Sequence, residues 1–251
     1  MGSWRGASAW LVVLALSTLV CASAQAAPPS SQGRVSVVLA QDDGGREHPQ
    51  VVVAVFGDSL ADGLWEGLRL ESRGGERSFL RLGTISKGLT RPDWRQWVRD
   101  GADRVRSSGA SKVLIMLGAN DLQGLRDGSR SAKAFASKEW DGVYGERVVE
   151  VVRAMTEAGA DVEWVGLPVM RDKSMDDGAR HIDSVVEATT RSLGIPWIRT
   201  SDLFRSKDGS YSVAPSRERL RADDGVHFTG TGYRNLARAA WARSEDGSTS
   251  R

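Results

Sequence analysis

The sequence predicts an α/β fold built on a parallel sheet, and three observations support this. Continuous apolar runs rich in β-branched residues at 51–56 (VVVAVF), 112–117 (KVLIML) and 161–167 (DVEWVGL) are typical of central strands covered on both faces. Segments with helical spacing of apolar residues lie between and after these runs. Glycine accounts for 28 of the 251 residues, which suits tight turns between strands and helices. Alternation of this kind implies helices on both sides of the sheet.

Shorter patterns supply the other elements. Residues 195–198 are a short fourth strand candidate, and residues 81–85 are a weaker one. Three helices are indicated by apolar positions that share a face, in chain order Val148, Val152 and Met155; Ile182, Val185, Val186, Thr189 and Leu193; and Tyr233, Leu236, Ala237, Ala240 and Trp241. Gly194, with Pro196 beyond it, is a typical stop for the second of these helices.

The first 26 residues have the layout of a secretory signal peptide. Arg5 precedes an uncharged apolar stretch at 9–22 (AWLVVLALSTLVCA), and Ala24-Gln25-Ala26 fits the small-x-small cleavage rule. We therefore expect a periplasmic or secreted protein with no stable membrane insertion after cleavage. An uncleaved anchor is the alternative, although the apolar stretch is shorter than the roughly 20 residues of a spanning helix.

The rest of the chain divides into a linker, one domain and a tail. Residues 27–50 are rich in Pro, Ser, Gly, Asp and Gln, so we expect a flexible linker with at most a short strand at 35–39. The domain is predicted at 51–243. The polar residues 244–251 are predicted to form a disordered tail.

Composition excludes several classes of function. Lys and Arg total 34 against 32 Asp and Glu, and this net charge of +2 argues against a nucleic-acid partner. The single cysteine, Cys21, excludes a disulfide framework and a cysteine-based zinc site within one chain. Chemistry that needs an imidazole must use one of three histidines: His48 in the predicted linker, His181 in a predicted helix, or His227.

Four short motifs stand where an open α/β sheet places its ligands, after the strands. They are Gly57-Asp58-Ser59-Leu60 after the first strand, Ser86-Lys87-Gly88-Leu89 after the weak strand, Gly118-Ala119-Asn120-Asp121 after the strand at 112–117, and Asp224-Gly225-Val226-His227 before the last helix. Taken singly, the first three are better explained as a helix N-cap serine and ordinary turns.

Each motif can also contribute to nucleophilic catalysis. A serine at a strand-to-helix turn lies where negative charge is favoured. A loop glycine can present its N–H closely to a ligand, and the Asn120 amide can donate to a developing oxyanion. Asp224 and His227 are three residues apart, so the carboxylate can meet one ring nitrogen while the other takes a proton. Asp223, Asp224 and His227 lack a partner histidine, so we expect no metal site.

Together and in this order, the four motifs resemble those of the SGNH, or GDSL-type, hydrolase superfamily over residues 51–242. Residues 164–171 (WVGLPVMR) and 224–233 (DGVHFTGTGY) further resemble an exported bacterial branch of that superfamily. The resemblance implies a flavodoxin-like three-layer α/β/α sandwich with about five parallel strands. It also implies that Ser59 is the nucleophile, His227 the general base and Asp224 the residue that orients it. Gly88, Asn120 and the Ser59 N–H would be the oxyanion donors.

The chemistry so implied is acyl transfer through an acyl-serine, with no cofactor. We expect an esterase acting on acetyl-type O-acyl groups of an envelope carbohydrate or a small ester. An O-acyltransferase that modifies a periplasmic or cell-wall glycan would use the same residues, and a non-catalytic glycan-binding module is a further alternative. Arg91 and Arg171 lie near the predicted active-site loops and are candidates for contact with an anionic substrate, although solvated surface arginines are the more ordinary interpretation.

Overall fold

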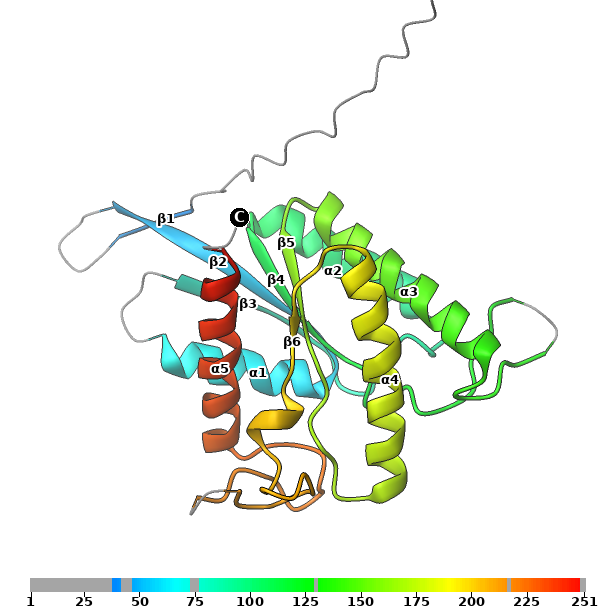
Figure 1. Ribbon diagram of the computed structural model, residues 1–251. Helices are drawn as coiled ribbons and strands as arrows, with labels where there is room; N and C mark the ends of the chain where they lie inside the picture. The colour runs from blue at the N-terminus through cyan, green and yellow to red at the C-terminus, as the bar shows by residue number, and fades with distance from the viewer. Residues whose placement is uncertain (1–37, 42–46, 73–76, 129–130, 216–217, 249–251) are drawn as a thin grey trace, which may run out of the picture. The chain divides into compact units, whose positions relative to one another are not determined.

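The computed structural model describes residues 38–41, 47–72, 77–128, 131–215 and 218–248 (Figure 1). The predicted signal peptide at 1–26 lies outside the described residues, as does much of the predicted linker. In the part of the chain that is described, no helix combines the length and apolar character needed to cross a membrane.

The fold is built on a sheet whose five parallel strands are β2 (Glu47–Gly57), β3 (Arg77–Gly83), β4 (Lys112–Met116), β5 (Asp161–Val165) and β6 (Trp197–Ile198). Their spatial order is β3-β2-β4-β5-β6. This order is the flavodoxin-like one, in which the chain first moves to one side of its first parallel strand and then crosses to the other. The predicted sandwich with about five parallel strands is therefore confirmed.

Within the described residues, five helices cover the sheet: α1 (Ser59–Glu71), α2 (Trp94–Ser108), α3 (Lys138–Glu157), α4 (Lys173–Ser192) and α5 (Gly230–Ser248). A short 3₁₀ turn, η1 (Ser201–Leu203), follows β6. Helices α1 and α5 pack against each other, whereas α3 contacts both α2 and α4. Helices α1 and α5 approach closely at Gly67. A Cβ on this residue would lie 2.3 Å from the carbonyl oxygen of Tyr233, so the contact requires glycine.

The strand ends and the chain ends differ from the prediction. Strand β1 (Val38–Gln41) pairs antiparallel with the start of β2, which begins at Glu47, so regular structure extends into the predicted linker. Strand β3 lies at Arg77–Gly83 rather than 81–85, and α5 continues to Ser248. These segments are held by backbone pairing or by helix continuation, which a search for apolar runs does not detect.

The central strand β2 ends in a tight turn that opens the site. Gly57 has φ of +150°, and a Cβ there would lie 1.9 Å from the carbonyl oxygen of Met116 in β4. Only glycine fits this position, because any side chain would collide with the neighbouring strand. The turn therefore brings the first residues of α1 to the carboxyl end of the sheet, beside the loops that follow β3 and β4.

Candidate active site

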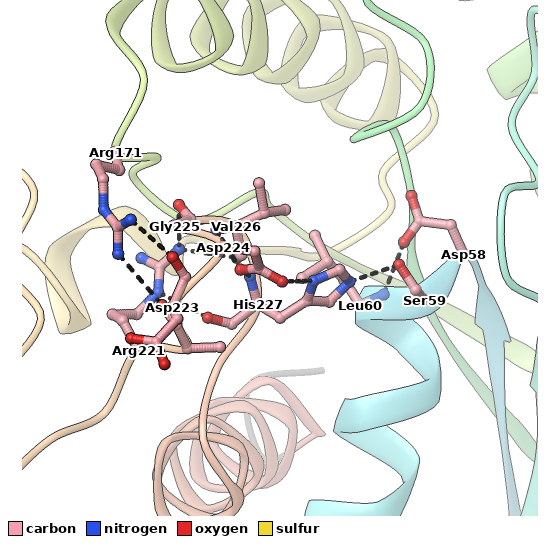
Figure 2. A network of polar contacts seen from close by, with 11 residues as sticks. Asp58, Ser59, Leu60, Arg171, Arg221, Asp223, Asp224, Gly225, Val226 and His227 are labelled. Atoms are coloured by element: carbon pink, nitrogen blue, oxygen red, sulfur yellow. Dashed lines mark hydrogen bonds and ion pairs between the residues drawn. The ribbon is translucent and has the colours of Figure 1, made fainter.

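The site is organised around a chain of two short hydrogen bonds between side chains. Ser59, the first residue of α1, has its Oγ 2.7 Å from Nε2 of His227, and Nδ1 of the same ring lies 2.7 Å from Oδ2 of Asp224 (Figure 2). With the ring proton on Nδ1, the imidazole donates to Asp224 and accepts from the Ser59 hydroxyl. The structure thus brings together the three residues that the sequence motifs predicted to act together.

Asp224 is held in its charged form by local hydrogen bonds. Burial by itself would raise the pKa of this carboxyl. The backbone N–H groups of His227 and Val226 both donate to Oδ1, and together with the His227 ring they lower the pKa to about 2. An aspartate that is ionised at neutral pH can accept the Nδ1 proton, fix the tautomer of the ring and stabilise an imidazolium when it forms.

Asp58 joins the start of α1 to the loop after β4. It is fully buried, and as the N-cap of α1 it accepts from the N–H of Leu60 at 2.9 Å. Its other oxygen accepts from the N–H groups of Gly118 at 3.0 Å and Ala119 at 3.2 Å. Burial raises the pKa of Asp58 to about 7 in spite of these donors. The contact fixes Ser59 relative to the loop that carries Asn120.

Asp121 performs the same task between the loops after β3 and β4. Its buried carboxylate accepts from the N–H groups of Leu89 and Thr90, from the Thr90 hydroxyl and from the Tyr144 hydroxyl. Burial raises the pKa of Asp121 above its usual value. The carboxylate lies so close to the chain that a Cβ on Gly88 would be 2.3 Å from Oδ1. Gly88 is therefore a glycine for a steric reason, independently of any role in catalysis.

The predicted oxyanion donors belong to loops that this network ties to Ser59. The Asn120 amide donates one hydrogen to the carbonyl oxygen of Lys87 at 2.9 Å, which leaves its second hydrogen for a ligand. Within the described chain, the backbone N–H groups of Ser59 and Gly88 donate to no protein acceptor. The arrangement can therefore offer N–H donors close to a serine hydroxyl.

The loop that carries Asp224 and His227 is held by two arginines. Arg221 is completely buried and donates to the carbonyl oxygens of Val169, Gly225, Val226 and His227. Arg171 is exposed and donates to the carbonyl oxygens of Asp223 at 2.7 Å and Ala222 at 3.5 Å. The guanidinium of Arg171 is thus engaged with the loop that carries Asp224 and His227, and its contact with an anionic substrate stays a prediction.

The other candidate residues from the sequence, one arginine and two histidines, lie in different environments. Arg91 follows the Gly88 loop, and its buried Nε has no hydrogen-bond partner among the described residues. His181 binds Asp141 at 2.6 Å on the α3–α4 side, away from Ser59, and the His48 backbone lies in β2. Over the described ranges, no group of three or more His, Cys, Asp or Glu side chains could hold a metal ion.

A protein-family model matches most of the chain. The family model described as "Protein of unknown function (DUF459)" matches residues 52–243. The chain belongs to this family. The matched region begins in β2 and ends in α5, so it contains Ser59, Asn120, Asp224 and His227 together with nearly all of the parallel sheet.

Solved structures with the same fold agree with the resemblance found in the motifs. A GDSL-like lipase from Bacteroides thetaiotaomicron VPI-5482 is 14% identical, with 78% of this chain and 88% of that chain covered and a TM-score of 0.55. The acetyl xylan esterase AlAXEase is 16% identical, with 76% and 98% covered and a TM-score of 0.54. The expected SGNH/GDSL-type fold is confirmed.

A curated relative matches only part of the chain. The glycerol-3-phosphate dehydrogenase [NAD(P)+] of Novosphingobium aromaticivorans is 30% identical over 111 residues, which are 42% of this chain and 31% of that protein. The chain thus spans about a third of the length of this relative. The glycine fingerprint of dinucleotide sites, G-x-G-x-x-G after a strand, does not occur in the sequence, and β2 is followed by Gly57-Asp58-Ser59 instead.

Proposed function

We propose that the protein is a serine esterase that hydrolyses O-acyl esters of the acetyl type through an acyl-serine intermediate. The observation that carries this proposal is the continuous chain from Ser59 Oγ through the His227 ring to Asp224. A serine hydroxyl is a weak nucleophile unless a base takes its proton during attack, and His227 Nε2 is within hydrogen-bond distance to do so.

The proposed reaction has two acyl-transfer steps. Ser59 Oγ attacks the ester carbonyl while its proton moves to His227 Nε2. The tetrahedral intermediate collapses as His227 returns that proton to the leaving alcohol, which gives the acyl-serine. Water then attacks with the same assistance and releases the acid. Asp224 stays ionised throughout and stabilises the imidazolium by charge and by its hydrogen bond.

The oxyanion of both intermediates would be bound by three N–H donors. These are the backbone N–H groups of Ser59 and Gly88 and the free hydrogen of the Asn120 amide. The N-terminus of α1 adds the positive end of a helix dipole at the same place. Such donors are effective because they are already oriented before charge develops. The buried carboxylates of Asp58 and Asp121 support this orientation, since they link the three loops that carry the donors.

We propose a carbohydrate ester or a small ester as the substrate class, which the fold shared with an acetyl xylan esterase supports. We also propose that the domain acts outside the cytoplasm after cleavage of residues 1–26, because Ala24-Gln25-Ala26 fits the cleavage rule. Amino-terminal sequencing of the exported protein tests the second proposal. A mature protein that still begins at Met1 would contradict it.

The central test compares the wild type with Ser59→Ala on a chromogenic acetyl ester. We expect hydrolysis to disappear in the variant, together with covalent labelling by a fluorophosphonate. Ser86→Ala is the matched control, because this exposed serine lies on the neighbouring loop. Unchanged hydrolysis by Ser59→Ala would refute the mechanism. Adding a glycan acceptor distinguishes an O-acyltransferase from an esterase. If acyl groups reach the glycan faster than they reach water, the proposed reaction is acyl transfer and not hydrolysis.

A further inference from the structure

The loop that carries Asp224 and His227 contains no regular secondary structure, yet it must place two side chains accurately. It lies between the isolated bridge residue Arg221 and the start of α5. Backbone contacts inside the loop are few: the N–H of Ala222 donates to the carbonyl oxygen of His227, and the N–H of Gly225 donates to that of Ala222. The remaining carbonyl oxygens need other donors, because unpaired buried carbonyl groups are costly.

Arg171 supplies some of these donors, through its side chain to Asp223 and its backbone N–H to Gly225 at 3.0 Å, and the Arg221 side chain supplies others from inside the protein. Its guanidinium is completely buried and lies over the rings of Tyr211 at 4.9 Å and Phe228 at 4.6 Å. All of its described hydrogen bonds go to backbone carbonyl oxygens, with Val169 at 2.6 Å and Val226 at 2.8 Å as the shortest. Arg221 is therefore a buried cation that connects the segment after β5 to the His227 loop.

Two peptide groups lie between this cation and the Asp224 carboxylate (Figure 2). In the peptide that joins Val226 to His227, the carbonyl oxygen accepts from Arg221 and the N–H donates to Asp224 Oδ1 at 2.9 Å. In the peptide that joins Gly225 to Val226, the carbonyl oxygen accepts from the backbone N–H of Arg171 at 3.0 Å and from Arg221 at 3.4 Å, and the N–H donates to the same Oδ1 at 2.8 Å. Hydrogen bonds arranged in series polarise one another, so the cation strengthens both N–H donors.

We propose that Arg221 is a positioning residue. Through these two peptide groups it orients the Asp224 carboxylate and favours its ionised form, and it thereby sets the position of the His227 ring. The inference rests on the proposed esterase function. It goes beyond that function because the described contacts of the Arg221 side chain are with backbone carbonyl oxygens and two aromatic rings, and not with Ser59 or the His227 ring. A lysine cannot replace it fully, since one ammonium group cannot reach four carbonyl oxygens in a fixed plane.

The first test is a double-mutant cycle between Arg221→Met and Asp224→Asn. In the wild-type background, we expect Arg221→Met to lower kcat by roughly 10- to 100-fold with little change in KM, which is typical of a small misplacement of a catalytic group. In the Asp224→Asn background, the same change should lower kcat by no more than about twofold, the usual scatter for independent sites. Equal losses in both backgrounds would overturn the proposal.

Arg147→Met is the matched control for loss of a buried arginine. Arg147 is also buried, lies over the Trp94 ring at 5.1 Å and donates to the carbonyl oxygens of Leu89 and Arg126, far along the chain from Asp224. We expect its effect on kcat to be the same with Asp224 and with Asn at that position. Where Arg221→Met does not fold, Arg221→Lys takes its place in the cycle and is expected to show an intermediate loss.

The second test needs no activity, so it separates failure of this inference from failure of the proposed function. A strong hydrogen bond from His227 Nδ1 to Asp224 gives a downfield proton resonance, which His227→Gln assigns against that of the His181–Asp141 pair. We expect the His227 resonance to broaden or move upfield in Arg221→Met and to persist in Arg147→Met. An unchanged resonance in folded Arg221→Met would overturn the proposal even if Ser59→Ala abolishes hydrolysis.

Discussion

Asp183 on α4 predicts how the stability of the domain depends on pH. Its carboxylate lies in a cavity of about 260 Å³ that is also lined by Trp197, and its described hydrogen bonds come from one donor, the N–H of Leu167, at 3.0 and 3.2 Å. Burial, with a smaller contribution from Glu187, raises its pKa from 3.8 to about 7. Between these two pH values the folded protein binds the proton more tightly than the unfolded chain. The free energy of unfolding therefore falls as pH rises through this window.

Asp183→Asn removes the titrating group and keeps an oxygen that can accept from Leu167. Between pH 5 and the folded pKa the wild type loses about 1.4 kcal/mol per pH unit from this group. The stability of the variant relative to the wild type should therefore be about 2–3 kcal/mol higher at pH 8 than at pH 5. Asp58 has a similarly raised pKa, but it is present in both proteins and cancels in the comparison.

Urea unfolding at the two pH values measures this difference. Asp177→Asn is the control, because its side chain is 60% exposed on the same helix and pairs with Lys173 at the surface. We expect the control to change stability by less than about 0.5 kcal/mol at either pH. A relative stability of Asp183→Asn that is the same at pH 5 and pH 8 would refute the argument, since the burial of charge would then carry no cost.

Two further predictions concern the oxyanion loops. Asn120→Ala should lower kcat on an acetyl ester by about 10²- to 10³-fold with KM little changed, because one preoriented donor is lost. Arg126→Ala, at an exposed position further along the same loop, is the control, and a rise in KM alone would contradict the assigned role. Gly88→Ala should lower both stability and activity, because its Cβ would lie 2.3 Å from Oδ1 of Asp121. Gly142→Ala on α3 meets nothing within 4 Å and should raise the unfolding free energy by up to about 1 kcal/mol in denaturant melts. If Gly88→Ala and Gly142→Ala change the unfolding free energy equally, the predicted collision between a Cβ at residue 88 and Asp121 does not occur.

The parallel sheet could be predicted because its strands are covered on both faces and therefore read as unbroken apolar runs. The segments that differ are those whose stability comes from pairing: β1 and the start of β2 are held by antiparallel partners, and β3 has a partly polar pattern. The proximity of Ser59 and His227 could be predicted because their motifs stand next to the expected elements and because histidine is scarce, while their roles stay predictions.

The supporting residues of the site could not be derived in the same way. Asp58 binds the chain about 60 residues further on, and Arg147 binds the carbonyl oxygen of Leu89, 58 residues before it. The contacts of Arg221 could not be predicted from the sequence, because buried arginines are rare. Its acceptors are backbone atoms, which leave no side-chain pattern in the sequence. One sequence signal for Asp58 and Asp121 was available: each is adjacent to a candidate site residue in its motif, Asp58 to Ser59 and Asp121 to Asn120.

The proposed nucleophile and its proposed base are in contact in the fold although they are 168 residues apart in the chain. Ser59 begins the first helix and His227 stands just before the last one, and these two helices pack together. Contacts so distant in sequence form late in folding, because closing the intervening chain costs entropy before the contact can repay it. Recovery of the proposed esterase activity during refolding should therefore lag behind recovery of helix and sheet signals, so that activity would report completion of the fold.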